Sequence, residues 1–188
     1  MDLSSLSAQQ LEGFRRRAGE KLRDEYGESD TIVIKDPRIC RFYPFWREVL
    51  VESGYQPFVI IPVREPKEVA ASLHERNNLR VDEALSLWRR HVEDAEIASR
   101  GQPRHILFWD DLLQDWRGVL DALRHNSDMR LFGNESEIDA FLTPAVSLHY
   151  RRELKPADDV SMVLFERMKT IAAQESSGAS FKASVSHS

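Results

Sequence analysis

Apolar and polar residues recur along the chain with two periods, which predict amphipathic helices separated by short strands. Near the N-terminus, apolar residues spaced by three and four predict a helix that starts at the capping-box pair Ser7 and Gln10 and stops at Gly27. Three apolar runs predict strands: TIVIK at 31–35, FVIIPV at 58–63 and HILFW at 105–109. Further helices are predicted at 44–53, 66–76, 82–100, 110–126, 136–142 and 157–173.

This order of elements predicts a three-layer α/β domain, with a parallel sheet covered by helices on both faces. The run at 31–35 is expected to be a strand buried on both faces, because apolar residues occupy successive positions. Pro62 lacks a backbone N–H, so its strand is expected at a sheet edge or a bulge. We expect a single domain over 1–174 and a disordered tail at 175–188, since that tail is small and polar.

Polar residues follow the predicted strands directly. In a parallel α/β sheet, ligands bind at the carboxyl ends of the strands. This rule places Lys35, Arg64 and the turn at 109–111 along one rim of the sheet. A strand-end lysine can also simply extend to water, and this alternative stays open for Lys35.

Arg64 and Ser72 are a candidate anion site, because a guanidinium offers a planar fork of donors that matches phosphate and a serine hydroxyl adds one more. Ser72 comes eight residues after Arg64, on the predicted helix that follows the strand. The same residues allow another interpretation. Arg64 can pair with Glu65 or Glu68, and Ser72 can be a small packing residue.

Composition narrows the class of protein. With 188 residues, 41% hydrophobic and 30% charged, the chain is typical of one soluble globular domain. A net charge of −5 provides no basic field for nucleic acid. Cys40 is the only cysteine, so no internal disulfide can form, and the six histidines lack a metal-ligand spacing. No stretch reaches the roughly 18 apolar residues of a membrane span, and no secretory signal is evident. We expect a cytoplasmic protein without a metal.

Three segments, in order over roughly residues 30 to 125, carry a resemblance to a known family. The segment VREPKEVAASL, which follows a predicted strand, resembles the nucleotide 3′-phosphate motif of the sulfotransferases that use 3′-phosphoadenosine 5′-phosphosulfate (PAPS). IVIKDPRICRFYPFW is similar to the family's second strand, which ends in a lysine near the sulfuryl group. ILFWDDLLQDW is similar to a strand-to-helix segment of the same family.

The resemblance implies a fold of the P-loop nucleoside triphosphate hydrolase type and PAPS as co-substrate, without a metal. It implies that Arg64 and Ser72 bind the 3′-phosphate and that Lys35 is catalytic, next to the transferred sulfuryl group. Fixed cations stabilise the charge that develops in such a transfer. The acceptor would be a hydroxyl or amine of a small molecule or carbohydrate.

The chain also departs from the family pattern. It contains no RSGTS-like run and no GxxxxGK[ST] run, so the loop that would bind the 5′-phosphosulfate is missing from these residues. Pro37 stands where some members have a histidine, and no catalytic base can be named. We therefore expect a sheet that is incomplete at its N-terminal side. Three accounts stay open: the C-terminal part of a longer sulfotransferase or a reading frame that starts late, a separate P-loop chain that completes the sheet, and a degenerate domain that keeps the fold without the activity. An exposed sheet edge would also allow self-association or pairing with a second chain. The alternative function is a non-catalytic module that binds a nucleotide or a partner.

Overall fold

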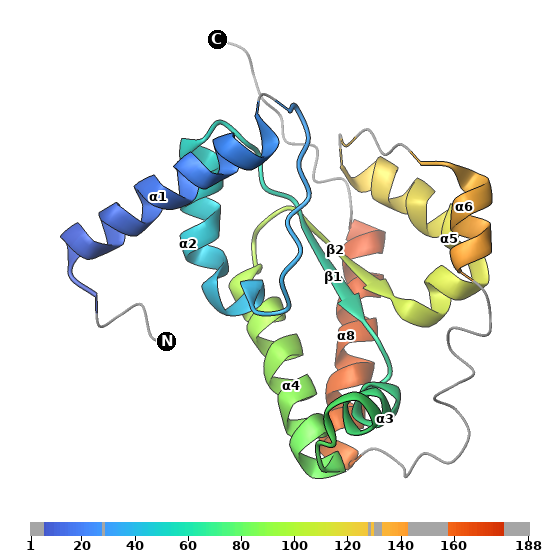
Figure 1. The fold of residues 1–188 in the computed structure, drawn as a ribbon. Helices are drawn as coiled ribbons and strands as arrows, with labels where there is room; N and C mark the ends of the chain where they lie inside the picture. The colour runs from blue at the N-terminus through green and yellow to red at the C-terminus, as the bar shows by residue number, and fades with distance from the viewer. Residues whose placement is uncertain (1–5, 28, 128, 130–132, 143–157, 179–188) are drawn as a thin grey trace.

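The computed structural model describes residues 6–27, 29–127, 129, 133–142 and 158–178. Most of these residues are helical, and a short parallel sheet lies at the centre (Figure 1). The elements in chain order are α1 (Ala8–Tyr26), α2 (Ile39–Glu52), β1 (Val59–Val63), α3 (Pro66–Asn77), α4 (Val81–Ala98), β2 (Arg104–Phe108), α5 (Trp109–Asn126), α6 (Glu135–Phe141) and α8 (Asp159–Gly178).

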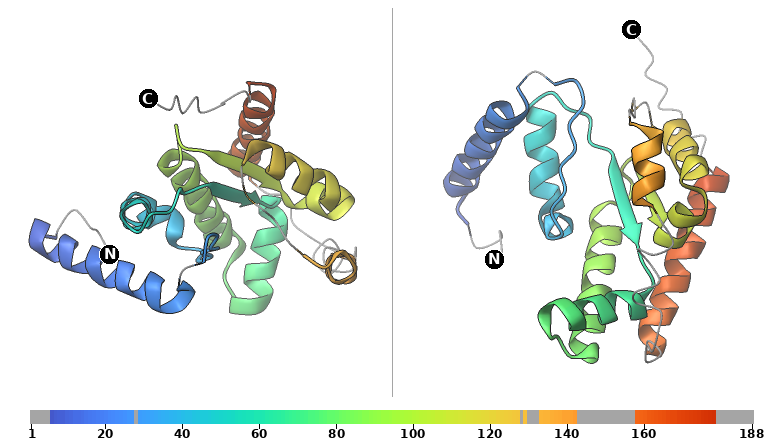
Figure 2. Two further views of the ribbon diagram at one scale, coloured as in Figure 1. Left: turned by 90° about the horizontal axis from the view of Figure 1, so that it is seen from above. Right: turned by 45° about the vertical axis from the view of Figure 1, so that its right-hand side comes forward.

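The sheet of the described residues consists of β1 and β2, which pair in parallel from Val59 opposite Arg104 to Val63 opposite Phe108. The prediction of a mixed α/β fold with a parallel sheet is thus confirmed at this coarse level. The α1–α2 pair and the α5–α6 pair lie on opposite sides of the strands (Figure 2). Within the described residues, no helix has the length and apolar character needed to cross a membrane.

The predicted strand at 31–35 is wrong for this structure. These residues are extended but form no ladder with β1 or β2. Val33 is 76% exposed, so the run is not buried on both faces. The Tyr26 hydroxyl donates to the Val33 carbonyl at 3.2 Å, which gives this carbonyl a partner outside any sheet. A short β-branched run favours an extended backbone, but pairing depends on the contacts that neighbouring strands offer.

One face of the sheet builds the main core. Ile61, Val63 and Ile106 point to the same side, where α4 and α8 pack. The buried members of this cluster are Ile61, Val63, Trp88, Val92, Ile106, Leu164, Phe165 and Met168. Full burial of each large apolar side chain contributes roughly 1.5–3 kcal/mol, so this cluster is the main source of stability for the sheet.

The other face is only partly covered. α5 packs against β2 on this side, where Asn126 contacts the His105 ring at 3.3 Å. On β1, Ile60 is 41% exposed and Pro62 is also exposed. On this face a helix packs against β2, whereas Ile60 and Pro62 of β1 are exposed, so the expected three-layer arrangement with helices on both faces is not confirmed.

Within the part of the chain that the structure describes, Pro62 lies on the edge of β1 that faces away from β2, and an edge is one of the two positions that its missing N–H predicts. The Val59 amide donates to the Pro103 carbonyl at 3.0 Å, so the amides of Val59, Ile61 and Val63 face β2. Backbone groups alternate along a strand, and those of Ile60 and Pro62 therefore point away from β2. A proline here removes no ladder bond.

Several helix ends follow local sequence signals. Both hydrogen bonds of the capping box between Ser7 and Gln10 form, and Gly27 ends α1 with φ +60°. Asn78 ends α3 in the left-handed conformation at φ 54°, which asparagine tolerates well. α8 continues to Gly178, beyond the boundary at 174 that was expected for the tail.

Candidate functional site

The carboxyl ends of β1 and β2 bring Arg64 and Trp109 together. Arg64 directly follows β1, and Trp109 directly follows β2. Because Val63 pairs with Phe108, the next residues on the two strands are neighbours. The guanidinium carbon of Arg64 lies 5.7 Å from the centre of the Trp109 ring, within the range of a cation–π contact. The sequence-based placement of both residues on one rim is confirmed.

Arg64 also forms an ion pair with the helix that follows it. Its Nε atom donates to Oε2 of Glu68 at 2.9 Å. The Glu68 side chain is fully buried, whereas 23% of the Arg64 side chain is exposed. Glu68 lies in the first turn of α3, where a carboxylate is favoured by the positive end of the helix dipole. One of the two pairings considered from the sequence is therefore formed.

Trp88 anchors the end of β1 from α4. Its indole Nε1 donates to the backbone carbonyl of Arg64 at 3.1 Å, and its ring belongs to the main core. The spacing of Trp88 predicted only a core residue. The signal that could have revealed more is chemical, because a buried indole N–H needs an acceptor. The acceptor could not be named from the sequence, since it lies 24 residues away.

Ser72 lies on α3, four residues after Glu68, and is partly buried. Residues four apart share a helix face, so Ser72 is on the face that carries the ion-pair partner of Arg64. This arrangement keeps Arg64 and Ser72 within one strand–helix unit, as the sequence predicted. It places a carboxylate between them along the helix.

Lys35 does not belong to this strand–helix unit, and the expectation that it ends a strand of the sheet is not met. It is exposed at the end of the extended segment and follows no strand. Its neighbour Asp36 forms a double hydrogen bond with the Arg38 guanidinium, at 3.0 and 2.8 Å. These bonds hold the pKa of Asp36 far below its ordinary value. Asp36 and Arg38 therefore pair with each other across the turn that follows Lys35.

The rim carries carboxylates as well as cations. Asp110 and Asp111 lie in the first turn of α5, next to Trp109. Lys67 pairs with Glu65 at 2.6 Å at the start of α3. An anion at this rim would therefore benefit from an added cation. Among the described residues, no group of three or more histidine, cysteine or acidic side chains is arranged to hold a metal ion.

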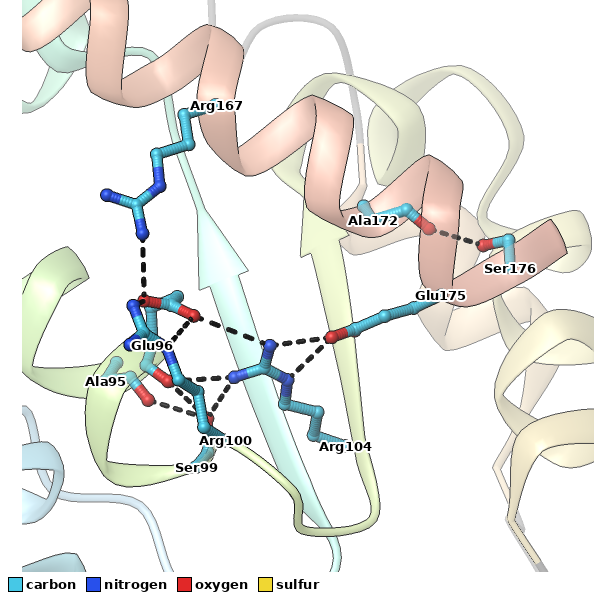
Figure 3. A network of polar contacts seen from close by, with 9 residues as sticks. All are labelled: Ala95, Glu96, Ser99, Arg100, Arg104, Arg167, Ala172, Glu175 and Ser176. Carbon is cyan, nitrogen blue, oxygen red and sulfur yellow. Dashed lines mark hydrogen bonds and ion pairs between the residues drawn. The ribbon is translucent and has the colours of Figure 1, made fainter. Parts of the chain in front are cut away.

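A second polar cluster lies at the amino end of β2, opposite the rim of Arg64. Arg104, the first residue of β2, lies between Glu96 of α4 and Glu175 of α8 (Figure 3). Its Nε and Nη2 atoms donate to Oε1 of Glu175 at 2.9 and 2.6 Å. Its Nη1 atom donates to the Glu96 carbonyl at 2.8 Å and to Ser99 Oγ at 3.0 Å. A single guanidinium thus joins β2, α4 and α8.

Glu96 is the shared acceptor of this cluster. Arg100 binds it through two hydrogen bonds of 2.8 and 2.6 Å, and Arg167 approaches it at 3.6 Å. The hydrogen bonds of Arg100, with the charges of Arg104 and Arg167, lower the pKa of Glu96. The cluster lies at the amino end of β2, opposite the rim of Arg64, and links β2 to α4 and α8.

The chain was compared with protein-family models, with curated proteins and with solved structures, and none of them matches it. The fold and the rim therefore define only a class: a mixed α/β protein with a parallel strand pair and an arginine at the carboxyl end of β1.

Proposed function

We propose that this chain is a sulfotransferase-like cytoplasmic protein whose β1–α3 unit binds the 3′-phosphate of PAPS. The observation that carries the proposal is the position of Arg64. It ends a parallel strand, contacts Trp109 and is held at its carbonyl by Trp88. A guanidinium at this edge of a parallel sheet is well placed for a nucleotide phosphate.

The residues would divide the binding. Arg64 would supply charged donors to the 3′-phosphate, and Ser72 a hydroxyl. Glu68 would orient the guanidinium through its bond to Nε. Because this carboxylate competes with the phosphate, we expect modest affinity for the isolated half-site.

Sulfuryl transfer would also need a loop that binds the 5′-phosphosulfate group. The S–O bond to the 5′-phosphate would break, with the electron pair staying on that phosphate. A new bond would join sulfur to a hydroxyl or amine of a small molecule or carbohydrate, and the acceptor proton would pass to water. Lys35 would stabilise the charge on the moving group. The 188 residues contain no 5′-phosphosulfate loop, so we propose transfer only when another segment supplies that loop.

Calorimetric titration with 3′-phosphoadenosine 5′-phosphate tests the binding, with 5′-AMP as the control ligand. Arg64→Lys keeps a cationic partner for Glu68 but loses the planar fork, and we expect about tenfold or greater loss of affinity. Arg76→Lys, on the exposed surface of α3, is the matched control and should bind like the unmodified chain. Equal affinity for the two nucleotides, or no effect of Arg64→Lys, would reject the half-site.

A non-catalytic partner-binding module is the second candidate. Its supporting observation is the partly uncovered surface of β1, with Ile60 41% exposed and Pro62 at a free edge. Self-association or a second chain could cover this edge. Sedimentation over a range of concentrations separates the candidates, because self-association without nucleotide binding would favour the module.

A further inference from the structure

An extended segment runs beside β1 without pairing to it. Residues 31–36 lie along α2 and β1, and the chain runs here in the same direction as β1 (Figures 1 and 2). α2 then leads back to the start of β1. An extended segment, a helix and a parallel strand in this order form a βαβ connection. The segment therefore already has the chain direction and the helical connection that a third parallel strand would need.

The edge of β1 that faces away from β2 can accept a strand. The backbone groups of Ile60 point to this edge, because the neighbouring amide of Val59 donates to β2. Pro62 removes one donor there but keeps its carbonyl. Exposed strand edges of this kind are templates for pairing.

The segment has the side-chain pattern of a half-buried strand. Ile32 and Ile34 are partly buried, whereas Thr31, Val33 and Lys35 are exposed. This alternation with period two matches a strand with one covered face. Two tyrosines hold the segment in its present position. Tyr26 donates to the Val33 carbonyl at 3.2 Å, and Tyr55 donates to the Ser29 carbonyl at 3.3 Å.

We propose that residues 31–35 dock on this edge of β1 as a third parallel strand, and that an oxyanion held between Lys35 and Arg64 stabilises the docked state. In parallel strands the carboxyl ends meet, so docking brings Lys35, the last residue of the run, to the rim of Arg64. Two cations brought close together repel each other, which raises the free energy of the docked state. A phosphate or sulfate between them attracts both and therefore lowers that free energy.

Docking adds the cation that the carboxylate-rich rim lacks. Lys35 is exposed in the present position, whereas Arg64 is bound to Glu68. The identity of the anion as a nucleotide phosphate rests on the proposed function. The docking itself rests only on the free edge, the direction of the segment and its alternation.

Amide hydrogen exchange measured by mass spectrometry tests the inference on the full chain. Peptides that cover 29–36 and 58–64 are followed in sodium sulfate, in 3′-phosphoadenosine 5′-phosphate and in sodium chloride of equal ionic strength. Docking predicts about tenfold or greater slowing of exchange in both peptides with sulfate, relative to chloride, and the proposed function predicts the same slowing with the nucleotide.

Two variants of one residue separate pairing from packing. Ile60→Pro removes the N–H that would bind the incoming strand, and it leaves the ladder to β2 intact because this amide points away from β2. It should abolish the slowing at 29–36, whereas Ile60→Val should keep it. Tyr26→Phe removes the hydroxyl that binds Val33 and should enhance the slowing at equal sulfate.

The outcomes are distinct. Slowing with sulfate but no affinity for the nucleotide supports docking and rejects the proposed function. Nucleotide binding without a change at 29–36 overturns docking and leaves the proposed function standing. Full protection of both peptides in chloride also overturns the inference, because the strand would then be permanent. Unchanged exchange in every anion overturns it as well.

Discussion

Arg64 donates through Nε to Oε2 of Glu68 at 2.9 Å, and the carboxylate of this pair is fully buried. The pair joins the end of β1 to the first turn of α3. It therefore has two consequences. It stabilises the strand–helix turn, and it withdraws part of the guanidinium from any anion at the rim.

Glu68→Gln should weaken the fold and strengthen anion binding. Loss of a charged hydrogen bond to a largely buried partner costs about 1.5–3 kcal/mol in the free energy of unfolding. Removal of the negative charge should at the same time raise the affinity for 3′-phosphoadenosine 5′-phosphate. Urea unfolding and calorimetry measure the two effects. Glu75→Gln, exposed on the same helix, is the control, and weaker nucleotide binding by Glu68→Gln would contradict the prediction.

Arg104→Met should be among the most destabilising substitutions in the chain. Only 7% of the Arg104 side chain is exposed, and its loss leaves Glu96, also 7% exposed, with fewer partners. Removal of one member of a buried ion pair costs about 3–5 kcal/mol. Arg167→Met is the matched control, since this side chain is 53% exposed and should cost less than about 1 kcal/mol. Equal unfolding midpoints for the two variants would argue against a stabilising role of the bonds that Arg104 makes to α4 and α8.

Glu96 should make the fold sensitive to acid. Its pKa is lowered in the folded protein, chiefly by the hydrogen bonds of Arg100. A group with a lowered folded pKa stabilises the fold above its unfolded pKa and loses this contribution as the pH falls through the folded value. Stability should therefore fall below about pH 4.3, the ordinary glutamate value. In Glu96→Gln the free energy of unfolding should fall less steeply as the pH is lowered. An unchanged dependence on pH would assign the acid sensitivity to other groups.

Gly19→Ala should stabilise the protein. Gly19 is buried in the interior of α1, and an added Cβ would lie 3.5 Å from Ser53 Oγ, an ordinary contact. Replacing a mid-helix glycine by alanine gains about 0.5–1 kcal/mol. Gly118→Ala is the contrasting variant, because its Cβ would clash with the carboxylate of Asp115, which accepts a hydrogen bond from the Gly118 amide. Thermal unfolding should show a higher midpoint for the first variant and a lower one for the second.

Local signals in the sequence account for much of the helical structure. The capping box of Ser7 and Gln10, the left-handed Asn78 and the apolar spacing around Trp88 mark features that the structure shows. These signals act within a few residues, so they can be read without the fold. The missing N–H of Pro62 likewise favoured a sheet edge or a bulge, and the structure shows the edge.

The site was predictable only in part. Arg64 at the end of a parallel strand followed from the order of elements, and its pairing with Glu68 was one of two open alternatives. The contact of Trp88 with the Arg64 carbonyl and the bridge from Arg104 to Glu175 join residues 24 and 71 positions apart. No local pattern encodes such pairs.

The sequence by itself determined the helix caps, the approximate positions of β1 and β2 and the residue types at their ends, since each depends on backbone preferences over a few residues. Only the tertiary structure decided that 31–35 is extended but unpaired, that Glu68 holds Arg64, and that Arg104 joins β2, α4 and α8. The physical reason is that pairing and burial are free-energy differences between competing partners, and those partners meet only when distant segments pack.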